Sequence, residues 1–242
     1  MSSQSLPYPR VLIKLSGQAL AGNKGFGIDP MTLQYYSAEI AQVRELNVEI
    51  AIVIGGGNFF RGSELAQVGI DRITADHMGM LGTIMNCLAF RDALEQHGVA
   101  TRIMSSIPMF GICEHYDYRN AMQHLTQGKV VLFAGGTGNP LVTTDTCASL
   151  RAIETKCDLL IKATGVNGIY NADPHLNPAA QLLSTMTFAE AIEKKYKVMD
   201  LSAFCQCQEH NLDINVCNLS HTGTLKNLLL GHHVGTRVIK SK

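Results

Sequence analysis

The chain has 242 residues, of which 46% are hydrophobic and 17% are charged, which is ordinary for a globular protein with a well-buried core. Lys and Arg together number 20, as do Asp and Glu, so no basic excess suggests nucleic acid as a main partner. No apolar run approaches the roughly 18 residues of a membrane span, and the first residues lack the pattern of a signal peptide.

Short apolar runs alternate with helical segments along the whole chain. Buried strands are predicted, from β-branched apolar runs, over residues 10–15, 51–54, 99–104, 129–134, 157–162, 213–218 and 236–239. Helices are predicted over residues 30–46, 58–67, 74–97, 120–126, 144–156, 187–195, 201–210 and 222–230. Since no linker or repeat interrupts this alternation, we expect one α/β domain over residues 1–242, in which residues 1–8 form a flexible tail.

The segment A-I-V-I-G-G-G-N-F-F-R-G at residues 51–62 is the most informative one. Its strand ends at three consecutive glycines, whose backbone N–H groups a ligand can approach closely because no Cβ is present. Such N–H groups before a helix start can bind an anion, and Arg61 adds a planar donor suited to phosphate. Taken alone, a tight strand-to-helix turn is an equally good interpretation.

Further loops rich in Gly, Thr or Asn follow two other predicted strands, at residues 135–145 and 163–174, and a glycine-rich loop at residues 22–27 comes shortly after the first strand. The carboxyl ends of parallel strands lie at one edge of a sheet, so these loops should build a shared crevice. Lys14, near the end of the first strand, either reaches this crevice or extends its ammonium group into water. Asp76 lies near a helix start, where composition alone favours a helix cap.

The crevice would combine the cations Lys14 and Arg61 with backbone N–H groups and the carboxylates Asp76, Asp145 and Asp173. The sequence has no Walker loop, no G-x-G-x-x-G and no G-x-S-x-G motif. Cations and N–H donors with few general-base candidates favour phosphoryl transfer, which depends on positioning and charge neutralisation. A phosphate or carboxylate acceptor fits best, because neither needs to lose a proton to a base.

The seven cysteines lack the spacing of a disulfide scaffold and fit a reducing compartment, so we expect a cytoplasmic protein. Cys205, Cys207 and His210 lie on one predicted helix, where residues two apart do not face each other. We therefore expect no zinc site there, and no metal held by protein side chains.

Several motifs together resemble one known family. They are K-L-S-G at 14–17, G-F-G-I-D at 25–29, V-I-G-G-G-N-F-F-R-G at 53–62, D-H-M-G-M at 76–80, A-G-G-T-G-N-P at 134–140, T-T-D at 143–145 and K-V-M-D-L at 197–201. From about Tyr8 almost to the C-terminus, the chain is similar to the bacterial uridylate kinases of the amino-acid kinase superfamily. The resemblance implies a three-layer α-β-α sandwich around a largely parallel sheet.

The resemblance also implies the reaction UMP + ATP → UDP + ADP, with Mg²⁺ bridging the ATP phosphates, in pyrimidine nucleotide biosynthesis. The implied catalytic residues are Lys14 and Arg61. We add Asp145 as a catalytic candidate, because it lies at a predicted helix N-terminus beside the phosphates, where it would orient Lys14 or a water on Mg²⁺. The implied ATP-binding residues are Lys14, Leu15, Ser16, Gly17, Gly57, Arg61, Thr164, Tyr170 and Asp173. The implied UMP-binding residues are Gly56, Asp76, Thr137, Gly138, Asn139, Pro140, Leu141, Val142, Thr143 and Thr144. Asp200 belongs to a family motif without an assignable role.

Members of this family are homohexamers that GTP activates and UTP inhibits, and the resemblance implies both properties here. The segment tied to the effector response comprises Gly22, Asn23, Lys24, Gly25, Phe26 and Gly27. Three residues depart from the usual pattern: Gln18 replaces a Glu, and Gly165 and Asn167 replace a Lys and an Asp.

Two other functions stay open. One is a related kinase that acts on a carboxylate or carbamate, against which the D-H-M-G-M segment argues. The other is a nucleotide sensor without activity, which would tolerate loss of Lys14, yet Lys14 is present.

Overall fold

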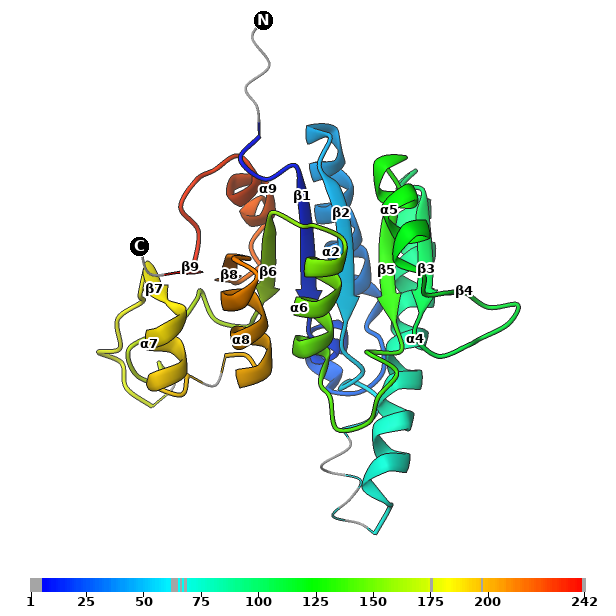
Figure 1. Cartoon of the computed structure of the whole chain (residues 1–242), viewed down its shortest axis with the longest axis horizontal. Coiled ribbons are helices and arrows are strands. Elements are labelled where there is room, and N and C mark those ends of the chain that lie inside the picture. Colours follow the sequence, from blue (N-terminus) through cyan, green and yellow to red (C-terminus); the bar gives the residue numbers. More distant parts are fainter. Residues whose placement is uncertain are drawn as a thin grey trace, which may run out of the picture.

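The strands join into one nine-stranded sheet in the order β4-β3-β5-β2-β1-β6-β8-β9-β7 (Figure 1). The computed structural model describes residues 6–61, 65, 67, 69–174, 176–196 and 198–240. The strands are β1 (Arg10–Leu15), β2 (Glu49–Ile54), β3 (Thr101–Ser105), β4 (Glu114–His115), β5 (Val130–Ala134), β6 (Leu159–Ala163), β7 (Thr185–Thr187), β8 (Ile214–Cys217) and β9 (Thr236–Ile239). Neighbouring strands are parallel, except that β8 and β9 are antiparallel. The predicted largely parallel sheet is therefore confirmed.

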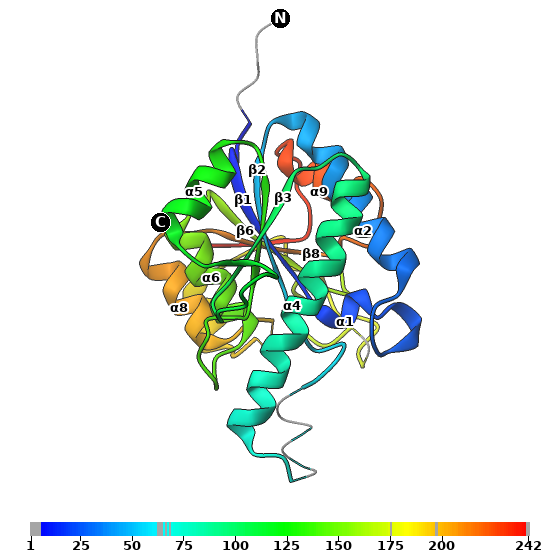
Figure 2. The same ribbon diagram turned by 90° about the vertical axis from the view of Figure 1, so that its right-hand side faces the viewer.

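Helices cover both faces of this sheet, as Figure 2 shows. On one face lie α2 (Pro30–Val43), α4 (Arg72–Gln96) and α9 (Thr224–Leu229), and on the other lie α5 (Tyr118–Thr126), α6 (Thr144–Glu154) and α8 (Leu201–Glu209). The shorter helices are α1 (Gly17–Leu20) and α7 (Phe188–Glu193), with 3₁₀ turns η1 (Gly22–Lys24) and η2 (Arg44–Leu46). The three-layer sandwich is confirmed.

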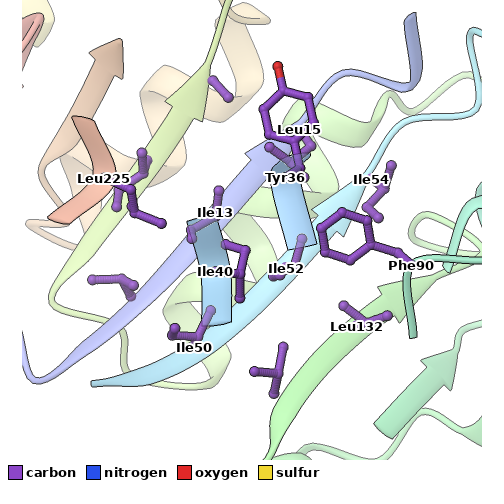
Figure 3. Close-up of a cluster of buried hydrophobic side chains, with 14 of the residues drawn as sticks. Ile13, Leu15, Tyr36, Ile40, Ile50, Ile52, Ile54, Phe90, Leu132 and Leu225 are labelled. Atoms are coloured by element: carbon purple, nitrogen blue, oxygen red, sulfur yellow. The ribbon is translucent and has the colours of Figure 1, made fainter. Parts of the chain in front are cut away.

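Alternate residues of the central strands pack on opposite sides of the sheet. Ile13 and Leu15 of β1 join a core cluster with Ile40 of α2 and Phe90 of α4 (Figure 3). Leu12, between them, belongs to a second cluster on the other face. Burial on both faces explains why these strands are continuous apolar runs.

The structure differs from the predicted elements at several ends. Helix α4 begins at Arg72, because Asp71 caps it by accepting hydrogen bonds from the backbone N–H groups of Ile73 and Thr74. The short strands β4 and β7 were not predicted. Tyr8, expected in a flexible tail, packs against the core.

The helix predicted over residues 58–67 lies partly outside the described residues. Asn58 and Phe59 form a turn. Among the helices that the structure describes, none is long and apolar enough to span a membrane.

Candidate functional site

Four adjacent strands of the sheet end in glycine- or threonine-containing loops. Ser16 and Gly17 follow β1, and the glycine loop, residues 55–57, follows β2. Gly135 follows β5, and Thr164 follows β6. Because β6, β1, β2 and β5 are parallel neighbours, these loops gather at one edge of the sheet, where α/β proteins bind ligands.

Two glycines at this edge, Gly17 and Gly56, have no room for a Cβ atom. A Cβ on Gly17 would collide with the carbonyl oxygen of Gly55, and a Cβ on Gly56 would collide with that of Gly79 in α4. Both obstacles are backbone atoms, which cannot turn aside as a side chain can. The glycines thus bring β1, the loop and α4 into close contact.

Two buried amides hold the glycine loop in place. Asn58 and Asn86 each donate from Nδ2 to the Oδ1 of the other, over 2.9 and 2.7 Å. Asn86 also donates to the carbonyl oxygen of Gly55, and Asn58 to that of Gly27, both over 2.8 Å. The pair therefore joins α4, the glycine loop and the end of the segment at residues 22–27.

Two lysines and an aspartate form a buried ionic cluster beside these loops. Lys14 of β1 and Lys162 of β6 are direct neighbours in the parallel register. Asp145, in the first turn of α6, lies between them: its Oδ1 is 2.7 Å from Lys14 Nζ and its Oδ2 is 2.6 Å from Lys162 Nζ. The structure thus brings Asp145 to Lys14, as the sequence suggested, and adds Lys162.

The pKa values in this cluster follow from burial and charge. Burial by itself would raise the pKa of Asp145, but the charges of Lys14 and Lys162 outweigh it and hold this pKa below its usual value. Burial and the charge of Lys14 lower the pKa of Lys162 to about 8, against the opposing effect of Asp145. Asp145 is therefore ionised near neutral pH. Lys162 loses its proton close to neutral pH.

A cavity of about 290 Å³, called here the smaller cavity, opens beside the glycine loop. Many residues predicted to bind a nucleotide line it: Gly56, Gly57, Arg61, Asp76, Leu141, Val142, Thr143 and Thr144. Sequence reasoning missed other residues of its lining: Phe60, Arg72, Gly79, Met80, Thr83 and Gly136.

Asp76 does not cap α4, so the interpretation that composition favoured is wrong. Its Oδ1 lies 3.0 Å from Arg72 Nε, and its Oδ2 accepts a hydrogen bond from the Leu141 N–H over 2.8 Å. Asp71 provides the cap instead. Asp76 therefore holds the loop after β5 against α4 and places a carboxylate at the smaller cavity.

Asp200 stabilises the start of α6. Thr143 caps this helix by accepting a hydrogen bond from the Asp145 N–H over 3.1 Å. The same Thr143 hydroxyl donates to Asp200, and Thr146 donates to the same carboxylate oxygen over 3.3 Å. Asp200 thus acts on the ionic cluster through the turn that carries Asp145.

A larger cavity, of about 720 Å³, is lined by residues of α1, of α2 and of the loop after β6. Ser16 and Thr164, both predicted to bind ATP, line it. Gly22 and Asn23, from the segment predicted to respond to an effector, line it as well. This segment is therefore close to one of the predicted substrate sites.

Some predicted residues lie elsewhere. Gly57 and Arg61, expected on the ATP side, line the smaller cavity, because the glycine loop turns toward α4. Tyr170, whose backbone forms a bridge with Leu182, and Asp173 are not among the described residues that line either cavity.

Further predicted residues do not line the described walls of the two cavities, among them Lys14, which lies in the ionic cluster, and Gly17, which packs against Gly55. Leu15 is buried in the core. Lys24, Gly25, Phe26 and Gly27 lie in the part of their segment beyond the larger cavity. Residues 137–140 lie in the loop after β5, where the Asn139 N–H donates to Thr137 Oγ1 over 3.3 Å.

The position of Lys162 in the sequence carries a signal for a site residue. Like Lys14, it is a lysine near the end of a buried apolar strand. Arg72 and Thr83 gave a weaker signal, because only the packing of α4 against the glycine loop shows that they line a cavity.

Comparison with known proteins gives consistent matches. The sequence model of the amino acid kinase family matches residues 9–218. The uridylate kinase of Alcanivorax borkumensis is 52% identical over 231 residues, which are 96% of this chain and 92% of the relative. That of Coxiella burnetii is 51% identical over 96% of this chain and 95% of its own length.

Solved structures agree with these sequence matches. The crystal structure of UMP kinase from Bacillus anthracis has a TM-score of 0.94 and 39% identity, and covers 98% of both chains. UMP kinase from Ureaplasma parvum has a TM-score of 0.89 and 35% identity, over 96% of this chain and 98% of the other.

Proposed function

The chain belongs to the amino acid kinase family and, within it, to the uridylate kinases, and we propose that its two cavities hold the two substrates of one reaction. It is a nucleoside monophosphate kinase, which transfers a phosphoryl group from ATP to UMP and so forms UDP and ADP. We assign UMP to the smaller cavity and ATP to the larger one.

The observation that carries this assignment is that residues of the ionic cluster directly adjoin, in the sequence, residues that line each of the two cavities. Thr144 lines the smaller cavity, and the next residue is Asp145. Ala163 lines the larger cavity, and the residue before it is Lys162. Positive charge beside both cavities is what transfer of a phosphoryl group between them requires.

Lys14 and Lys162 would stabilise the negative charge of the phosphoryl group as it leaves ATP. Asp145 contacts both ammonium groups and so fixes their positions before the substrates bind. The reaction needs no general base, because a phosphate monoester with a second pKa near 6 is mostly dianionic at pH 7. The UMP phosphate is thus already a nucleophile.

Groups at the smaller cavity fit a nucleoside monophosphate. Asp76 can accept hydrogen bonds from ribose hydroxyls, and Arg61 and Arg72 can bind phosphate oxygens through their planar guanidinium groups. Backbone N–H groups of the glycine loop add donors for the same phosphate.

We place Mg²⁺ on the ATP phosphates. This ion usually keeps several waters and is bound by phosphates with one or two carboxylates. Each Asp145 oxygen lies within 2.7 Å of a lysine Nζ, which leaves the carboxylate little capacity as a metal ligand. Among the described residues, no group of three or more His, Cys, Asp or Glu side chains could hold a metal ion. When bound, Mg²⁺ would neutralise phosphate charge during the transfer.

We extend the proposal to a homohexamer in the cytoplasm, activated by GTP and inhibited by UTP, that serves pyrimidine nucleotide biosynthesis. Leu81 and Met85 support subunit contacts, because these apolar side chains of α4 are 43% and 40% exposed. The cysteines are all free thiols, as suits a reducing compartment. Light scattering would measure the oligomer, and assays with each nucleotide would test regulation.

The decisive experiment is an ADP-release assay with Mg-ATP and a panel of acceptors. The panel comprises UMP, CMP, dTMP, AMP, aspartate, acetylglutamate and carbamate, each with and without GTP. We expect strong turnover with UMP alone. Turnover of an amino acid or carbamate would overturn the assignment of the smaller cavity, and UMP binding without turnover would indicate a sensor.

Lys14→Ala tests the role of the ionic cluster. We expect kcat to fall by about 10²–10³-fold, as when a donor to the transition state is removed, while UMP binding stays nearly unchanged. The matched control is Lys226→Ala, at an exposed position of α9. An unchanged kcat in Lys14→Ala would remove Lys14 from the mechanism.

A further inference from the structure

The buried amides of Asn58 and Asn86 lie beside the glycine loop but outside both cavities. Asn86, within α4, is 0% exposed, and Asn58, directly after the glycine loop, is 1% exposed. Neither is among the described residues that line the two cavities. A buried amide costs stability unless it is hydrogen-bonded, so the partners of this pair decide whether the fold tolerates it.

The two amides use all four of their side-chain N–H groups. Nδ2 of Asn86 donates to the Gly55 carbonyl and to Asn58 Oδ1. Nδ2 of Asn58 donates to the Gly27 carbonyl and to Asn86 Oδ1. Because a carbonyl oxygen can only accept, each nitrogen must face its glycine, and this fixes the orientation of both amides. One closed set of hydrogen bonds therefore holds the glycine loop and Gly27 together.

Gly27 is bound to Asn58 at two points. Its N–H donates to the Asn58 backbone carbonyl over 2.9 Å, and its own carbonyl accepts from Asn58 Nδ2 over 2.8 Å. Next to them the rings of Phe26 and Phe59 meet edge to face, with their centroids 6.0 Å apart. The end of the segment at residues 22–27 is therefore tied to the turn that follows the glycine loop.

The segment at residues 22–27 and the glycine loop line different cavities. Gly22 and Asn23 line the larger cavity, and Gly56 and Gly57 line the smaller one. The amide pair joins the far end of the segment to the residue that precedes these two loop glycines. A ligand that orders one of the two segments should therefore also order the other.

We propose that Asn58 and Asn86 are positioning residues, which make the glycine loop and the segment at residues 22–27 move as one unit. UMP in the smaller cavity then orders residues 22–27 without touching them, and a nucleotide against Gly22 and Asn23 favours the form of the loop that binds UMP. Such coupling is equal in both directions, because it is a difference between binding free energies. The inference rests on the proposed function, because it assigns UMP to the smaller cavity.

Amide hydrogen exchange of the unaltered protein, with and without UMP, measures this coupling. We expect saturating UMP to slow exchange in residues 22–27 by about fivefold, the low end of usual coupling strengths. Exchange should also slow in residues 135–144, which supply part of the smaller cavity. The proposal is overturned if residues 135–144 respond to UMP and residues 22–27 do not. This measurement needs no variant, so it decides the matter even if a buried substitution prevents folding.

Asn58→Asp tests whether the amide pair carries the coupling. At nearly constant size, the carboxylate still accepts from Asn86 but has no proton to donate to the Gly27 carbonyl. We expect UMP to leave exchange in residues 22–27 unchanged in this variant while it still slows exchange in residues 135–144. We also expect the KM for UMP to rise about tenfold at little change in kcat, the usual effect of losing one buried hydrogen bond. A response of residues 22–27 as large as in the unaltered protein would overturn the proposal.

The matched control is Asn227→Asp, which makes the same change from amide to carboxylate at an exposed position of α9. It should keep the KM for UMP and the response of both segments to UMP. The result also separates this inference from the proposed function. A protein that does not turn over UMP would overturn the proposed function, whereas turnover of UMP without a response in residues 22–27 would overturn this inference alone.

Discussion

At the scale of single residues, Lys162 offers a direct test through pH. Its pKa of about 8 lies below the ordinary lysine value of 10.5, so half of the folded protein loses this charge at about pH 8. We expect kcat/KM, which reports ionisations of the free enzyme, to fall by about tenfold per pH unit above that point. Lys162→Arg keeps the charge and should remove this fall, whatever its absolute activity.

Stability should change in the opposite direction, which separates loss of charge from unfolding. Between about pH 8 and pH 10.5 the unfolded chain holds the Lys162 proton and the folded chain does not. The contribution of Lys162 to the free energy of unfolding therefore rises with pH across this window. Denaturant titrations of the unaltered protein and of Lys162→Arg at about pH 8 and about pH 10.5, the two ends of that window, would measure it. A parallel loss of stability and activity would contradict the assignment.

Asp76 and Asp71 form a natural pair for mutation, since they lie five positions apart at the start of one helix. Asp76→Asn should raise the KM for UMP by about 10–100-fold and leave that for ATP unchanged, because it removes a charged acceptor at the smaller cavity. Asp71→Asn is the control, because Asn caps a helix as well as Asp does. Equal effects of the two changes, or equal effects on both substrates, would contradict a role of Asp76 in binding UMP.

The ionic cluster shows which site residues the sequence alone could predict. Lys14 and Asp145 could be placed at the site because each follows or ends a strand with a recognisable loop. Lys162 could not be placed there, because it reaches Lys14 only if β6 pairs with β1. Local sequence patterns do not show the order of strands in a sheet. Asp76 was wrongly predicted to cap the helix, because Asp71 and Asp76 both lie near its start and either could be the cap residue. The structure shows that Asp71 is.

At the scale of elements, the contact between the glycine loop and α4 can be tested with two glycines. Gly56→Ala would drive a methyl group into the Gly79 carbonyl, and overpacking of this kind costs about 1–3 kcal/mol. Gly79→Ala meets only Phe60 O at 3.7 Å and removes a glycine from a helix interior, so it should gain up to about 1 kcal/mol. Urea unfolding midpoints at unchanged m would measure both.

If Gly56→Ala proved as stable as the unaltered protein, the close contact between loop and helix would be refuted.

Sequence patterns predict the long helices and buried strands well, because each is a continuous run with one period. They miss β4 and β7, which have two and three residues and owe their strand pairing to their neighbours. The Asn58–Asn86 pair was equally invisible, since its members lie 28 residues apart.

At the scale of the whole molecule, both core clusters rest on one sheet and should unfold together. Ile40→Val affects the cluster under α2, and Ile214→Val affects the cluster on the opposite face. Each should lower the free energy of unfolding by about 0.5–1.5 kcal/mol, and the double variant should show the sum within about 0.5 kcal/mol. Guanidinium titrations followed by circular dichroism and tyrosine fluorescence would measure this.

Two separate transitions, or midpoints that differ between the two probes, would contradict a single cooperative domain.

The sandwich as a whole was predictable, because alternating strands and helices leave few other architectures. The reversal of β9 was not, because β9 lies between β8 and β7 and its direction depends on pairing with both of these strands.

The register of β1 and β6 has a consequence for how much of this protein is folded in a cell. Two ammonium groups at directly opposed positions repel each other, and one carboxylate offsets only one of their two charges. Within the ionic cluster one net positive charge therefore remains, which a bound anion would offset. By mass action, every tenfold rise in nucleotide above its dissociation constant should add about 1.4 kcal/mol of stability. Starvation for nucleotides would then lower the amount of folded protein as well as its rate of turnover.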